Sequence, residues 1–145
     1  MRPRDAAIPG LLAHFPFDAY AEGKLANTVE SDKPATSGAA NRIVEGKHRS
    51  ALELTGDDEV NTPFGNFARN QPFTLSLWIW TPIVQSRSVV LHRSMAWTDA
   101  GSRGYSILIE EGKLSASLVH FWPGNALRVR MRDALPLREW KHVTL

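Results

Sequence analysis

The chain has 145 residues, of which 43% are apolar and 22% are charged, and its formal net charge at pH 7 is +2. These values are typical of a single soluble globular domain, and the charge excess is too small to indicate a nucleic-acid partner. The sequence contains no cysteine, which excludes disulfides, a Cys-ligated zinc site and a thiol nucleophile. No apolar run approaches the roughly 18 residues that are needed to cross a bilayer. We therefore expect no nucleic-acid partner and no membrane insertion.

Short strands are predicted along most of the chain. Residues 1–10 are expected to be a linker or an N-terminal extension. The first strand is expected in "GLLAHFPFD", where alternate residues are apolar: Leu11, Ala13, Phe15 and Phe17. Residues 30–50 are irregular and predict surface loops with one short strand, whereas "ALELT" predicts a short strand that ends at the turn "GDD".

The clearest strand is "FTLSLWIWT", which has a proline at each end. One face is apolar, with Phe73, Leu75, Leu77 and Ile79, and the other carries Thr74, Ser76, Trp78 and Trp80. Aromatic residues on the second face predict a strand in the centre of its sheet. We expect Trp78 and Trp80 to lie in the core or on the floor of a cleft.

Five further strands are predicted in the C-terminal half: "RSVVLHR", "GYSILIE", "KLSASLVHF", "ALRVRMR" and "EWKHVTL". Glu111-Gly112 predicts a hairpin between the second and the third. The fourth alternates Leu127, Val129 and Met131 with Arg128, Arg130 and Arg132. Helical periodicity is nearly absent. Many short strands with turns between them predict an all-β fold, an antiparallel sandwich or barrel.

The ordered motifs "AHFPFD", "ALELTGDDEV", "QPFTLSLWIWTP", "GYSILIEEGKLSASL" and "LREWKHVTL" resemble the laminin-G-like, concanavalin A-like jelly roll. The segment from "HRSMAWTDAGSRG" to "NALRVR" resembles the version of this module in large planctomycete-type bacterial proteins, where it often follows a cytochrome-c-like region. In the family, the motif "W-x-H-V-T" continues into further strands that close the two sheets. The resemblance therefore implies that residues 11–145 are an incomplete domain, truncated at the C-terminus.

For function, the resemblance implies a non-catalytic carbohydrate-binding module in a secreted or otherwise extracytoplasmic protein. The alternative is a structural or docking domain that contacts neighbouring domains of the same protein and binds no glycan. An enzyme is not expected in this segment. The paired carboxylates of a glycosidase, a nucleophile elbow and the zinc and phosphate-loop motifs are all missing from the sequence.

The resemblance also implies calcium as a cofactor, because many modules of this family bind Ca²⁺ through side-chain and backbone oxygens. The candidate ligands are Asp18, Asn27, Asp57, Asp58 and Asn61. The alternative is that Asp57 and Asp58 only favour a turn.

The loop "AWTDAGSRG" is the candidate recognition element. Trp97 could stack on a sugar ring while Asp99, Ser102 and Arg103 bind hydroxyls, and Trp122 could line the same side. The alternative is a tryptophan that plugs one end of the sandwich or packs against a neighbouring domain. The arginine stripe at residues 128, 130 and 132 could bind sulfated or uronic glycans, or could instead be a solvated face that protects an edge strand.

Overall fold

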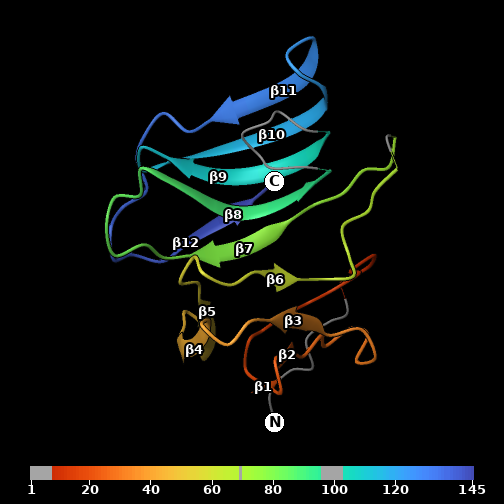
Figure 1. The fold of residues 1–145 in the computed structure, drawn as a ribbon, viewed down its shortest axis with the longest axis vertical. Coiled ribbons are helices and arrows are strands. Elements are labelled where there is room, and N and C mark those ends of the chain that lie inside the picture. Colours follow the sequence, from red (N-terminus) through yellow and green to blue (C-terminus); the bar gives the residue numbers. More distant parts are fainter. Residues whose placement is uncertain (1–7, 69, 96–102) are drawn as a thin grey trace. The chain divides into compact units, whose positions relative to one another are not determined.

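A computed structural model describes residues 8–68, 70–95 and 103–145. All the regular elements of these residues are strands, labelled β1 to β12 in Figure 1, and no described segment is helical. The all-β prediction is therefore confirmed. The described part of the chain contains no helix that could cross a membrane. Two compact units divide the chain, residues 1–65 and residues 66–145.

The first unit is built from short strands. One sheet has the order β1-β2-β3-β6, with the bounds Tyr20–Ala21, Lys24–Leu25, Ala35–Ser37 and Val60–Asn61. A separate antiparallel pair consists of β4 (Arg42–Glu45) and β5 (Ser50–Glu53). The strand predicted in "ALELT" is confirmed as β5, whereas residues 30–50 hold β3 and β4 rather than the single strand expected there.

The prediction of a strand in residues 11–18 is wrong, because no strand forms in this segment. Its backbone bonds instead to the buried amide of Asn27, whose Oδ1 accepts the His14 N–H at 3.1 Å, and the His14 carbonyl accepts the Thr28 N–H at 3.0 Å. Phe17 has a φ of +60°, which also breaks an extended ladder. The sequence has the apolar alternation of a strand, but a hydrogen bond to the Asn27 side chain takes the place of pairing with another strand.

The second unit contains two sheets. The larger has the order β11-β10-β9-β8, with the bounds Asn125–Arg130, Lys113–Phe121, Gly104–Glu110 and Arg87–Ser94. These strands run side by side in Figure 1, from green β8 to blue β11. The smaller sheet pairs β7 (Ser76–Ile79) with β12 (Lys141–Thr144), and this pairing continues through two backbone hydrogen bonds between Leu75 and Leu145.

The core of the second unit lies between its two sheets. Buried residues of β9, of β10 and of the segment between β11 and β12 form one cluster: Ile107, Ile109, Leu114 and Leu135. Apolar side chains of β7, of β12 and of the residue before β7 pack against it: Leu75, Leu77, Ile79 and Val143. Each fully buried aliphatic side chain contributes about 1.5–3 kcal/mol. The unit is thus an antiparallel β-sandwich.

The opposite face of β7 and β12 points away from this core. Trp78 and Trp80 are 40% and 42% exposed, so they do not lie in the core, and the alternative, the floor of a cleft, stays a prediction. The ring centroids of Trp78 and His142 are 5.1 Å apart, and the ring centroids of Trp80 and Trp140 are 6.5 Å apart. Among the described strands β7 pairs with β12 alone, so it is not central in its sheet.

The hairpin predicted at Glu111-Gly112 is confirmed. It joins β9 to β10 with Lys113 opposite Glu110, and both turn residues have positive φ, +51° and +75°. Two positive φ values are the requirement of the tight turn that matches the twist of paired strands. This turn fixes which residues of β9 and β10 share a face.

Candidate functional site

One face of the larger sheet is apolar, whereas the other carries serines and arginines together with the buried Leu108, which lies opposite Ser115. Side chains alternate along a strand, so the apolar positions of "KLSASL" point into the sandwich while Ser115 and Ser117 point to the other side. The strand register places Ser115 opposite Arg130 and Ser117 opposite Arg128, and Ser106 of β9 lies opposite Ser117 on its other side. The three serines are buried. We call this side of the sheet the polar face.

Arg128 is held in place by two contacts on the polar face. Its Nε donates a hydrogen bond to Ser117 Oγ at 3.0 Å. Its guanidinium lies 5.4 Å from the centroid of the Trp122 ring, within the range of a cation–π contact. Trp122 follows β10, and it remains 46% exposed. An aromatic surface, a cation and a hydroxyl therefore meet at this edge of the sheet.

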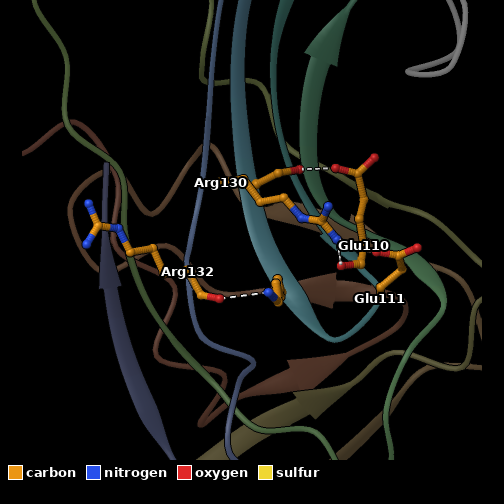
Figure 2. Close-up of polar contacts among 6 residues, drawn as sticks. Glu110, Glu111, Arg130 and Arg132 are labelled. Carbon is orange, nitrogen blue, oxygen red and sulfur yellow. Dashed lines mark hydrogen bonds and ion pairs between the residues drawn. The ribbon is translucent and has the colours of Figure 1, made fainter.

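Arg130 has different partners, which Figure 2 shows. Its Nη2 donates to the Glu110 carbonyl oxygen and to Glu111 Oε2, both at 2.8 Å. The Glu110 carboxylate accepts a hydrogen bond from Ser115 Oγ at 2.5 Å. The bond and charge of Arg130 lower the pKa of the Glu111 carboxyl, with a smaller contribution from Lys113. Glu111 therefore stays ionised below the ordinary glutamate range.

These groups border an open depression of about 410 Å³. It is lined by Ser86, Arg87, Glu110, Glu111, Arg128 and Arg130. The lining holds three arginines and two glutamates, so its formal charge is 3 − 2 = +1. We call it the arginine-lined depression. Of the stripe predicted to bind anions, Arg132 lies beyond the end of β11, and its side chain points away from the Arg130 cluster in Figure 2.

The structure places part of the predicted recognition loop. Trp97, Asp99 and Ser102 lie outside the described residues. Arg103 is exposed, and its carbonyl oxygen accepts the Met95 N–H at 3.0 Å, which closes the base of the β8–β9 connection. Of the two members of the predicted set that the structure describes, Arg103 and Trp122, it is Trp122 that reaches the polar face.

Four of the five predicted calcium ligands have separate protein partners. Asn27 is 2% exposed, and its Oδ1 accepts the N–H groups of His14 and Val29, both at 3.1 Å. Asp18 pairs with Arg49 at 3.0 Å, although its second oxygen, Oδ1, is buried without a partner. Both lone pairs of the Asn27 oxygen are thus in use, and Asn27 does not fit a metal site.

The other three calcium candidates lie around β6. Asp58 Oδ2 accepts the Ala40 N–H at 2.6 Å, Asn61 Nδ2 donates to Glu59 at 2.7 Å, and Asp57 is exposed. Among the described residues no three His, Asp or Glu side chains gather closely enough to hold a metal ion. The Asp58 contact is a bond from a side chain to a neighbouring backbone segment. Asn27 is therefore excluded from the predicted set by its backbone contacts, and calcium binding by the other candidates stays a prediction.

Sequence reasoning missed the serines and Glu110 of the polar face. A signal was present, since the predicted hairpin and the alternation in "KLSASL" together put Ser115 and Ser117 on the face opposite to the core. The register between β10 and β11 could not be predicted from the sequence, because a β-bulge shifts it between Val119 and Phe121.

The chain is similar to the crystal structure of an S-layer domain-containing protein (residues 221–444) from Clostridium thermocellum. The TM-score is 0.67 and the sequence identity is 19%, and the match covers 86% of this chain and 58% of that one. At this identity the likeness shows the fold alone. No protein-family model matches the chain, and no curated protein matches it.

Proposed function

We propose that the chain is a non-catalytic carbohydrate-binding module of a larger extracytoplasmic bacterial protein, with the jelly-roll arrangement of the laminin-G-like class. The observation that carries the proposal is the position of Trp122, half exposed beside Arg128 and Ser117 on the polar face. An apolar ring with a few fixed polar groups is the usual composition of a sugar site. A tryptophan that only plugged the sandwich would be buried.

The placement outside the cytoplasm has separate support. S-layer proteins form cell-surface layers, and the solved structure that this chain resembles carries that name. Fold likeness is weak support for function, so the sugar assignment depends on the polar face and not on that relative.

A glycan array with the wild-type protein and two tryptophan variants tests the proposal. We expect Trp122→Ala to lose the binding seen for the wild type. Trp80→Ala is the matched control, since Trp80 is similarly exposed but directly follows β7 of the other sheet. Equal binding by the wild type and Trp122→Ala would contradict a sugar site on the polar face.

A second candidate function is docking of a neighbouring domain of the same protein without glycan binding. One observation favours it: the apolar face of β10 and β11 continues past the core into exposed side chains, namely Leu118, Leu127, Val129 and Met131. Hydrogen exchange of β11 in this chain and in the parent protein distinguishes the two functions. Docking predicts slower exchange of β11 amides in the parent, together with an empty glycan array.

A further inference from the structure

We propose that the ligand of the polar face carries an oxyanion group, as uronic and sulfated sugars do, and that Arg128 binds this group. The inference rests on the carbohydrate-binding function proposed above. It adds the chemical class of the sugar and the residue that selects it.

Arg128 is oriented before any ligand arrives. Ser117 takes its Nε–H, and the Trp122 ring lies against its guanidinium. Neither contact uses the hydrogen-bond positions of its two Nη groups. A planar guanidinium with fixed orientation can form two parallel hydrogen bonds to a carboxylate or a sulfate, which a neutral hydroxyl cannot match.

Arg130 lies two residues along the same strand face but is already paired. Its Nη2 donates to Glu111 and to the Glu110 carbonyl, and the Glu110 carboxylate is in turn bonded to Ser115. Arg130 is therefore less available to a ligand than Arg128. Among the contacts described, those of Arg128 involve no carboxylate.

The chemistry of the lining also argues against a neutral glycan as the preferred ligand. The net formal charge of the lining is +1, which favours a negatively charged ligand, and the exposed Trp122 beside Arg128 can contact the apolar face of the sugar ring. A short acidic saccharide with one carboxylate or sulfate per residue meets both requirements. The two sources of the oxyanion differ in geometry and can be distinguished by titration.

The test is isothermal titration calorimetry with three probes: tetragalacturonate, its fully methyl-esterified form and a sulfated tetrasaccharide. The wild type should bind at least one charged probe about tenfold or more tightly than the neutral ester, and Arg128→Ala should remove that preference. Arg128→Lys keeps the charge but lacks the planar fork, so it should also lose most of the preference. It serves as the readout if the alanine variant does not fold.

Arg132→Ala is the matched control, because Arg132 follows β11 and points away from the cluster. Its affinity for the charged probes should stay within about twofold of wild type. Whichever charged probe binds more tightly identifies the oxyanion as carboxylate or sulfate. Binding of the neutral ester as tight as that of the charged probes would overturn the inference and leave the sugar site in place. Binding of none of the three, together with an empty glycan array, would overturn both.

Discussion

At the scale of single residues, Arg128 and Arg130 show how neighbours with the same charge acquire different roles. Both project from the same face of β11, but Arg130 is neutralised by Glu111 while Arg128 rests on a serine and a tryptophan. The sequence displays both arginines, so a charged stripe was predictable. Their partners were not, because they depend on cross-strand register and on the turn at Glu111-Gly112.

The pairing of Glu111 with Arg130 leads to a prediction for Glu111→Gln. Losing the carboxylate leaves Arg130 with the Glu110 carbonyl as its remaining partner of the two, so an acidic saccharide should bind about two- to fivefold more tightly, the effect of one exposed ion pair. Calorimetry at neutral pH measures this. Glu139→Gln is the control, since it breaks an exposed pair with Lys141 on the other sheet. Equal affinities of the two variants would contradict the idea that Glu111 and the acidic saccharide compete for Arg130.

The same pair sets the sign of a pH effect. Arg130 lowers the pKa of Glu111, so the contribution of the pair to stability is present above the ordinary glutamate value of about 4.3. It is lost as the pH falls through the lowered pKa.

At the scale of elements, the long alternating strands were predictable and the short ones were not. The predicted strands from "RSVVLHR" to "ALRVRMR" correspond to β8, β9, β10 and β11, because their alternation extends over six to nine residues and glycine marks the turn. The two-residue strands of the first unit carry too few residues for a period. Residues 11–18 have the alternation of a strand, but the backbone of His14 bonds to Asn27 and Thr28 and not to a neighbouring strand.

The pairing of β8 with β9 predicts the effect of Gly104→Ala. Gly104 has a φ of +142°, and a Cβ there would lie 2.6 Å from Ser94 Cα and close to the Arg93 carbonyl oxygen. Strain and overlap together should destabilise the protein by about 2 kcal/mol or more, measured by urea unfolding. Gly124→Ala is the control, because its Cβ would meet only the Phe121 side chain at 3.6 Å. Equal stability of the two variants would contradict the register that places Gly104 of β9 opposite Ser94 of β8.

At the scale of the whole molecule, composition and element order predicted the class of fold, and the sandwich of the second unit confirms it. The division at residue 65 was not predictable, since no linker or change of composition marks it. The exposure of Trp78 and Trp80 was also out of reach, because alternation shows that two faces differ but not which face is covered. The closing strands implied by the resemblance remain a prediction.

The separate partners of four of the five calcium candidates predict the response of the whole protein to the ion. A site with a dissociation constant of about 0.1 mM would add roughly 2.7 kcal/mol at 10 mM Ca²⁺, which corresponds to several degrees in melting temperature. We expect a change of less than about 1 °C relative to 10 mM Mg²⁺, because Asn27 is committed to backbone N–H groups and the other ligands do not gather. A rise specific to calcium would contradict this.

The central claim is that the polar face of β8–β11 binds an acidic saccharide. Its most direct test is a ¹H–¹⁵N chemical-shift map of the protein titrated with tetragalacturonate and with the sulfated tetrasaccharide. We predict that at least one of the two produces the largest changes at the Trp122 indole N–H, the Arg128 Nε–H and the Ser117 amide. Changes confined to the outer face of β7 and β12, around Trp78 and His142, or no changes with either probe, would contradict the claim.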